Sequence, residues 1–222
     1  MTEFIYLPPQ SPYLTVIYQD DDIAVFDKQP GLLSVPGRNL EHRDSLALRA
    51  MRVWPDARVV HRLDMATSGL IIMALHRDAQ SHISRQFQLR QPKKCYIAEI
   101  WGHPRHTKGT VDLPLRCDWP NRPRQIVDPI SGKSALTHWQ ILEHKKRTSI
   151  VELKPVTGRS HQLRVHMQNL GHPIIGDKLY AQDEALNAAP RLHLHAESLS
   201  FYHPRENRWL SFNSPAPFFR CS

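Results

Sequence analysis

Residues 60–75 read VHRLDMATSGLIIMAL, and this stretch decides the fold more than any other. Its second half, LIIMAL (70–75), is a continuous apolar run of strand length, which is typical of a buried strand. Its first half is a polar turn in which Asp64 precedes two hydroxyl residues, Thr67 and Ser68. Such a turn can hold a carboxylate through hydroxyl and backbone N–H groups. From the residues alone, Asp64 is either a structural cap of this turn or a catalytic group at the entry to the strand.

Around this stretch the chain alternates between short strands and helices without strict βαβ repetition. Helices are predicted from the Asp44–Ser45 cap to about Trp54, over Arg77–Leu89, and from the Ser160 cap to Leu170. Further strands are predicted over residues 15–21, 23–28, 94–101, 135–142, 148–156, 192–201 and 209–212. The Pro-rich stretch LPLRCDWPNRPRQ (113–125) is predicted to be an exposed arm or loop. The pattern predicts one α+β domain with a mixed, largely antiparallel sheet.

The charge balance points to a polyanionic partner. The 222 residues include 29 Lys and Arg and 21 Asp and Glu, which gives a net charge of +8. Residues 1–30 carry −4, so the remainder carries +12. Such an excess is most simply explained by nucleic acid. No apolar run approaches a membrane span, the N-terminus does not read as a secretory signal, and the three cysteines suggest neither a disulfide framework nor a zinc site. We therefore expect a cytoplasmic monomer without a membrane partner.

Two further segments carry candidate functional residues. In LKPVTGRSHQLRVH (153–166), a strand meets a helix, and Arg159 with the helix N-terminus forms a possible phosphate site. Arg164 lies at the edge of the apolar stripe, where its guanidinium can fork onto a carboxylate; alternatively, both arginines line a solvated helix. Tyr96 opens a strand directly after Lys93 and Lys94 and is either functional or a cross-strand packing aromatic.

The 14 histidines do not suggest a metal site. His161 and His166 are five residues apart on a predicted helix, which is neither the i+3 nor the i+4 spacing that places two ligands together. His193 and His195 lie on one face of a predicted strand. Structural or RNA-facing roles are expected for them, and no metal is expected.

Taken together, these segments resemble the RluA family of RNA pseudouridine synthases. HRLDMATSGL (61–70) is similar to the family's catalytic-aspartate motif, with every fixed position filled. KKCYIAEIWG (93–102) resembles its tyrosine strand, and LKPVTGRSHQLRVHM with the following GHPIIGDKLY (171–180) resembles its third motif and the loop after it. DKQPGLLSVPG (27–37) is similar to the opening motif, with the proline displaced by one position. The resemblance covers about residues 14–213, within a catalytic domain of residues 1–222 that no S4-like domain precedes.

The resemblance implies a single catalytic domain, in which helices flank a bifurcated sheet with a central RNA-binding cleft. It also implies that the enzyme flips a uridine out of the RNA and isomerises it to pseudouridine without a metal, nucleotide or flavin cofactor. By the same resemblance Asp64 is the catalytic group, attacking the sugar or base covalently or abstracting a ribose proton. Tyr96 is expected to stack on the flipped uracil and help to remove its C5 proton, and Arg164 to pair with Asp64 and keep it ionised.

We expect Arg62 to fill the gap left by the flipped base, because a guanidinium can stack on bases. The other residues expected to bind RNA are His61, Lys93, Lys94 and Arg159. LLSVPGR and DWPNRP are most similar to family members that modify both 23S rRNA and tRNA, which implies stem-loops of both as substrates. The alternatives are a non-catalytic RNA-binding or chaperone protein on the same fold, and a metal-dependent nuclease or deaminase, for which the metal-binding motifs are missing.

Overall fold

The computed structural model describes residues 5–219, so Cys221 lies outside the described residues. The chain forms two compact units, the first made of the residues up to Lys93 with Ser198–Ser214 and the second of Lys94–Glu197 with the residues from Pro215 onward. The chain passes between the units inside β5 (Lys93–Trp101), inside β11 (Leu194–Tyr202) and after β12 (Trp209–Asn213). Neither unit is therefore one continuous stretch of sequence.

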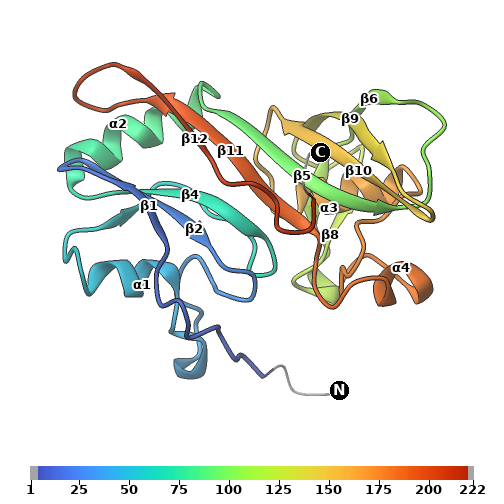
Figure 1. The fold of residues 1–222 in the computed structure, drawn as a ribbon, viewed down its shortest axis with the longest axis horizontal. Helices are drawn as coiled ribbons and strands as arrows, with labels where there is room; N and C mark the ends of the chain where they lie inside the picture. Colours follow the sequence, from blue (N-terminus) through green and yellow to red (C-terminus); the bar gives the residue numbers. More distant parts are fainter. Residues whose placement is uncertain (1–4, 220–222) are drawn as a thin grey trace. The chain divides into compact units, whose positions relative to one another are not determined.

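The first unit is built on antiparallel strands (Figure 1). β2 (Ile23–Lys28) lies between β1 (Val16–Gln19) and β4 (Ser68–Ala74), β3 (Arg58–Val59) also pairs with β4, and β12 pairs with β11. All seven residues of β4 are buried, as the apolar run predicts. The helices of this unit are α1 (Leu46–Met51), α2 (Arg77–Gln88) and the 3-10 turn η1 (Leu40–His42).

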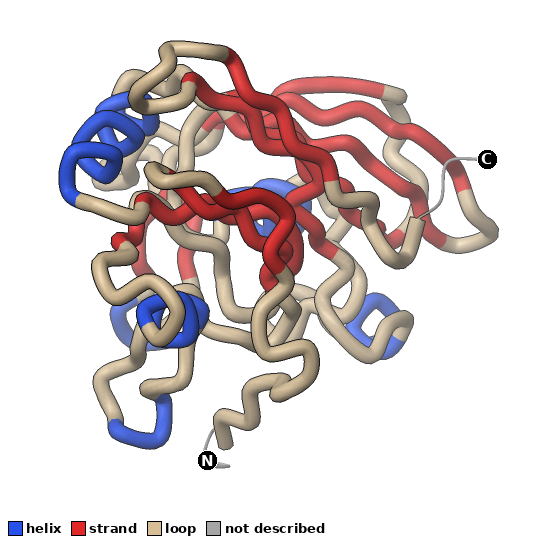
Figure 2. Tube along the Cα trace, turned by 60° about the vertical axis from the view of Figure 1, so that its left-hand side comes forward, coloured by secondary structure: helices blue, strands red, loops and turns tan. Residues whose placement is uncertain are grey.

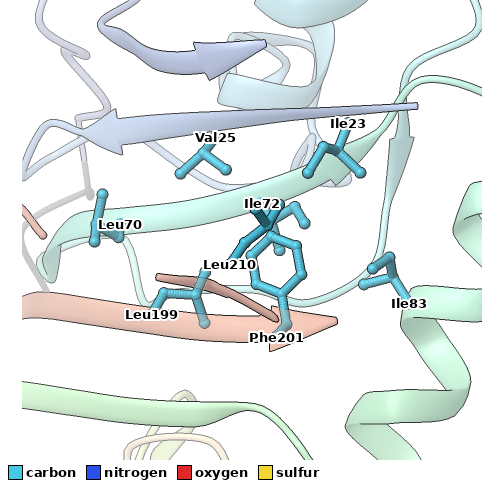
Figure 3. Packing of buried hydrophobic residues seen from close by; sticks show 8 residues of the cluster. All are labelled: Ile23, Val25, Leu70, Ile72, Ile83, Leu199, Phe201 and Leu210. Carbon is cyan, nitrogen blue, oxygen red and sulfur yellow. The ribbon is translucent and has the colours of Figure 1, made fainter. Parts of the chain in front are cut away.

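β2 and β4 bury both of their faces, and their side chains alternate between the two faces. On one face Ile83 of α2 packs with side chains of β2, β4, β11 and β12, namely Ile23, Val25, Leu70, Ile72, Leu199, Phe201 and Leu210 (Figure 3). The intervening residues, such as Phe26 and Ile71, are equally buried, and the Phe26 ring lies 5.8 Å from that of Trp54, which follows α1. Packing on two faces explains why the strand sequences are continuously apolar.

The second unit also has more strands than helices. Figure 2 shows the strands of the whole chain in red and the helices in blue. Its antiparallel order is β5, β10 (Thr148–Pro155), β9 (Leu136–His144) and β6 (Lys108–Asp112). A separate hairpin pairs β7 (Leu115–Cys117) with β8 (Gln125–Val127) around the 3-10 turn η2 (Trp119–Asn121). The helices are α3 (Gln162–Asn169) and α4 (Asp183–Asn187). No helix among the described residues is long and apolar enough to cross a membrane.

A buried carboxylate stabilises the sheet of the second unit. Glu99 on β5 accepts hydrogen bonds from Thr148 Oγ1 at 2.6 Å and from His193 Nδ1 at 3.0 Å. Burial raises the pKa of Glu99, but the hydrogen bonds from His193 and Thr148 and the nearby Lys145 ammonium lower it to about 2. The ionised carboxylate therefore ties β10 and the segment before β11 to β5.

The structure confirms the α+β class, and all strand pairings described above are antiparallel. Two helix boundaries were predicted wrongly. α1 ends at Met51, three residues before the predicted end. α3 begins at Gln162, because His161 is its N-cap in the left-handed conformation (φ 53°), and Ser160 lies before it. Leu170, the predicted last residue of this helix, is its C-cap and is exposed.

Candidate functional site

Asp64 lies in the first unit, in the loop between β3 and β4. The Thr67 N–H donates to the Asp64 carbonyl oxygen at 3.1 Å, which closes the predicted turn. Thr67 and Ser68 are buried, whereas Asp64 is half-buried. The turn therefore fixes the backbone beneath the carboxylate and leaves the side chain partly accessible.

Lys28, at the end of β2, anchors this loop from below. Its side chain is fully buried, and its Nζ donates to three backbone carbonyl oxygens at 2.8–3.1 Å, those of Gln29, Leu32 and Met65. Three acceptors match the three donors of an ammonium group. Burial lowers the pKa of Lys28 to about 7, against the opposite effect of the Asp64 and Asp27 carboxylates. The sequence reading did not assign a role to Lys28, although it lies in the opening motif.

Ser34 holds the residue on the other side of Asp64. Its Oγ donates to the Leu63 carbonyl oxygen at 2.7 Å and accepts from the Leu63 N–H at 3.1 Å. The Gly31 N–H donates to the Met65 carbonyl oxygen at 2.8 Å. The loop of residues 29–34 thus binds the backbone immediately before and immediately after Asp64. Fixing a reacting group from both sides in this way is typical of pre-organised catalytic sites.

His61 and Arg62, both predicted to bind RNA, differ in their surroundings. The His61 ring stacks on Phe87 with centroids 4.6 Å apart, and its Nε2 accepts from the Ile72 N–H at 3.1 Å. His61 therefore has a structural role between the loop, α2 and β4. Arg62 is exposed, as a side chain that enters an RNA helix must be.

Tyr96, Lys93 and Lys94 lie at the start of β5. Tyr96 is half-buried and lies opposite Leu153 of β10 in the sheet register. Lys93 is exposed, whereas the Lys94 Nζ donates to the Thr157 carbonyl oxygen at 3.4 Å. Burial lowers the pKa of Lys94 to about 8, so part of its charge is lost at the alkaline edge of the physiological range. Lys93 is therefore better suited than Lys94 to contact a phosphate.

Arg164, on α3 in the second unit, is buried against Asp177. Its Nε and Nη2 donate to the two carboxylate oxygens at 2.8 and 2.6 Å, a bidentate fork. Gly176, which precedes Asp177, has φ 69°, and a Cβ there would lie 1.9 Å from the Arg191 carbonyl oxygen. Arg164 therefore does not line a solvated helix. The sequence reading missed Asp177, although the GDKLY segment was singled out. The pairing of Arg164 with Asp64 stays a prediction.

Arg159 lies in the turn between β10 and α3. Its Nε donates to the Ser134 carbonyl oxygen at 3.0 Å, and its backbone N–H donates to Gln162 Oε1 at the same distance. The buried Gln162 side chain also accepts from Thr157 Oγ1 and donates to β9. The turn is thus fixed, with Arg159 half-buried at its edge.

Asp20, Asp22 and His203 are the one group within residues 5–219 with the composition of a metal site. The backbone N–H groups of Arg205 and Glu206 donate to His203 Nδ1 at 3.3 and 3.1 Å. The ring proton therefore lies on Nε2, which donates to Asp20 Oδ2 at 3.0 Å and has no lone pair for a metal. This group joins the β1–β2 turn to the β11–β12 turn by hydrogen bonds, and it contains two of the five acidic residues near the N-terminus.

Comparisons with known proteins identify the family of this chain. The family model described as RNA pseudouridylate synthase matches residues 22–169. The dual-specificity RNA pseudouridine synthase RluA of Escherichia coli K12 is 55% identical over 214 residues, covering 96% of this chain and 98% of that protein. Its counterpart in Vibrio cholerae is 51% identical over 219 residues, covering 99% and 89%. The solved structure of human RNA pseudouridylate synthase domain containing 1 has a TM-score of 0.77 at 31% identity, covering 93% of this chain and 84% of that one.

The chain belongs to the RNA pseudouridylate synthase family. It is therefore an enzyme, an isomerase that acts on RNA. The matches give no support to a non-catalytic RNA-binding protein on the same fold.

Proposed function

We propose that this enzyme converts uridine to pseudouridine in both tRNA and 23S rRNA stem-loops, with Asp64 as its catalytic group. The observation that carries the substrate choice is the 55% identity, over nearly the whole of both chains, to a relative described as dual-specificity. The choice of Asp64 rests on the match to the aspartate motif and on the backbone contacts made by Lys28 and Ser34 on either side of it. Residues that only cap a turn do not need such support.

The reaction breaks the N-glycosidic bond of uridine, turns the uracil, and rejoins it to the ribose through C5. A proton leaves C5 and one is gained at N1, so there is no net redox change or hydrolysis. The Asp64 carboxylate either attacks the sugar or base, or removes a ribose proton to give a glycal. In this proposal Tyr96 stacks on the flipped uracil and assists removal of the C5 proton, and Arg164, fixed by Asp177, keeps the Asp64 carboxylate ionised.

Extraction of the target base costs a few kcal/mol of stacking and pairing. We propose that the exposed Arg62 recovers part of this cost by stacking in the gap, and that Lys93 and Arg159 contact phosphates. His61 and Lys94 were placed in the same group, and their contacts favour a supporting role in holding Arg62 and the start of β5. The predicted RNA-binding cleft belongs to this proposal, as do a monomeric state and action in the cytoplasm, where both RNAs are found.

The direct test is pseudouridine formation on uridine-containing tRNA and rRNA fragments in excess chelator, mapped by chemical labelling. We expect wild-type activity on both RNAs and none for Asp64→Asn. Asp56→Asn, an exposed acid in the same unit, is the matched control and should remain active. Absence of pseudouridine on either RNA class would refute dual specificity, and an active Asp64→Asn enzyme would refute the catalytic assignment. Deleting the protein from its host and mapping the uridines that lose modification identifies the target positions.

A further inference from the structure

The β7–β8 hairpin presents an exposed tryptophan that the proposed mechanism does not use. Trp119 begins the η2 turn at the hairpin tip and is 65% exposed. The guanidinium carbon of Arg122 lies 3.3 Å from the centroid of the Trp119 ring, so the two planar groups are in direct contact. A large aromatic side chain at such a position buries little of its own surface, and folding alone does not account for it.

The hairpin tip is held rigidly by hydrogen bonds. The Asp118 N–H donates to the Arg124 carbonyl oxygen at 2.9 Å, and the Asn121 N–H donates to the Asp118 carbonyl oxygen at 3.0 Å. The Asn121 side-chain amide also donates to Asp118 Oδ2 at 3.0 Å. Because these contacts bracket Trp119, a ligand that binds its ring meets a side chain on a fixed backbone. Such pre-organisation lowers the entropy cost of binding.

The base of the hairpin is joined to the helix that carries Arg164. The Gln125 N–H donates to the Tyr180 hydroxyl at 2.8 Å, and the same hydroxyl lies 2.7 Å from His161 Nδ1. The guanidinium carbon of Arg164 lies 5.0 Å from the centroid of the Tyr180 ring. Leu115 of β7 shares a buried cluster with Tyr180. Within the second unit, the hairpin therefore shares the Tyr180 side chain with the Arg164 region.

We propose that Trp119 stacks on an unpaired base in the loop of the substrate RNA, with Arg122 supporting the ring from its other side. Aromatic rings bind single-stranded bases by stacking, and arginine adds a cation–π contribution. The polar side chains next to Trp119 are Asp118, Asn121, Arg122 and Arg124, so the tip carries a net positive charge, which suits RNA and differs from the apolar core of a protein interface. Every base has a π-face, so this contact tolerates different sequences, as an enzyme that acts on two RNAs requires. The inference rests on the proposed function for its ligand.

The test compares Trp119→Ala, Trp119→Phe and wild type in the binding of a fluorescently labelled tRNA anticodon stem-loop at several salt concentrations. Loss of one stacking contact should raise the Kd of Trp119→Ala by about 5- to 100-fold. The slope of log Kd against log salt should be unchanged, because no charge is removed. Trp119→Phe should recover most of the affinity. In turnover, KM should rise with kcat nearly constant. Ile130→Ala, which changes a 96% exposed side chain in the turn after β8, is the matched control.

A Kd for Trp119→Ala within twofold of wild type would overturn the proposal. The exposed Trp119 ring would then be assigned to a contact with a protein. Trp119→Phe binding as weakly as Trp119→Ala would also overturn it, because phenylalanine retains a ring face. Thermal unfolding of each variant distinguishes a damaged hairpin from a lost contact. Pseudouridine formation by the wild-type enzyme on the same RNA is measured in parallel, so a wrong substrate choice is recognised separately from the variant comparison.

Discussion

Replacing Lys28 by methionine tests how the buried ammonium supports the loop that carries Asp64. The substitution keeps a long apolar stem and removes the donor to three backbone carbonyl oxygens, of which the one on Met65 keeps the hydrogen bond from the Gly31 N–H. Each acceptor left unsatisfied costs about 1–3 kcal/mol of folding free energy. The loss is partly offset, because the variant no longer buries a charge.

The pH dependence of the free energy of unfolding separates the loss of the hydrogen bonds from the removal of the buried charge. In the folded state burial lowers the pKa of Lys28 to about 7, whereas an unfolded lysine titrates near its ordinary value of 10.5. Between these values the unfolded chain binds more protons, so the stability of the wild type rises with pH relative to Lys28→Met. Integration from pH 7 to pH 9 gives a relative gain of about 2 kcal/mol, with a slope of at most about 1.4 kcal/mol per pH unit.

The assay is denaturant unfolding of both proteins at pH 6, 7, 8 and 9, followed by tryptophan fluorescence. Lys133→Met, which removes an exposed lysine, is the control and should track the wild type at every pH. A difference between wild type and Lys28→Met that is constant from pH 7 to 9 would refute the depressed pKa. We also expect Lys28→Met to lose about 10- to 100-fold in kcat, because its loop no longer fixes the carboxylate. Full activity would show that the Lys28 contacts do not position Asp64.

Four further outcomes are expected. Ser34→Ala leaves the buried Leu63 N–H without its acceptor, so the free energy of unfolding should fall by about 1–3 kcal/mol, with kcat also reduced; an unchanged kcat would argue against positioning. Asp177→Ala leaves the Arg164 guanidinium buried without its carboxylate and should cost about 3–5 kcal/mol in denaturant unfolding, whereas a cost below about 1 kcal/mol would contradict burial of the pair. The ionised Glu99 stabilises the fold fully above pH 4.5, and this contribution should disappear as pH falls towards 2, so that wild type and Glu99→Gln converge in acid; curves that stay parallel would count against the lowered pKa. RNA affinity should fall steeply with salt concentration, and an affinity that does not change with salt in an electrophoretic or anisotropy assay would refute the proposed phosphate contacts.

Local sequence pattern was sufficient to predict the longer strands and the long helix of the first unit. The apolar run at 70–75 and the amphipathic spacing over 77–89 each produced an element within two residues of its observed bounds. β3 and β6 were missed because both are short, and β6 (Lys108–Asp112) is also mostly polar and pairs with β9. The prediction of an exposed arm or loop over residues 113–125 was wrong in part, because this stretch contains β7, with Leu115 buried, and the start of β8. The capping residues that the sequence displays do not indicate the early end of α1, where the Val53 N–H donates to the Ala50 carbonyl oxygen, or the left-handed cap of α3.

The candidate-site residues that lie in a sequence motif could be predicted. The residues that hold them in place from distant parts of the chain could not. Asp64 and Arg164 were found from their segments. Asp177, which pairs with Arg164, and Ser34, which holds the residue before Asp64, were not found. Both are ordinary polar residues, and their burial appears only after folding. Lys28 illustrates the limit most clearly, since a lysine in a sequence is normally a surface residue.

The passage of the chain between the two units has a consequence for synthesis on the ribosome. The core of the first unit includes Leu199, Phe201 and Leu210, which are translated after the entire second unit up to Glu197. The segment that carries Asp64 therefore emerges early but cannot complete its core until the last strands follow. Domains that are continuous in sequence fold as they emerge, whereas this arrangement delays the loop that carries Asp64 until translation is almost finished. A nascent or truncated chain should then expose the apolar face of β4, and degradation of incomplete products would be correspondingly fast.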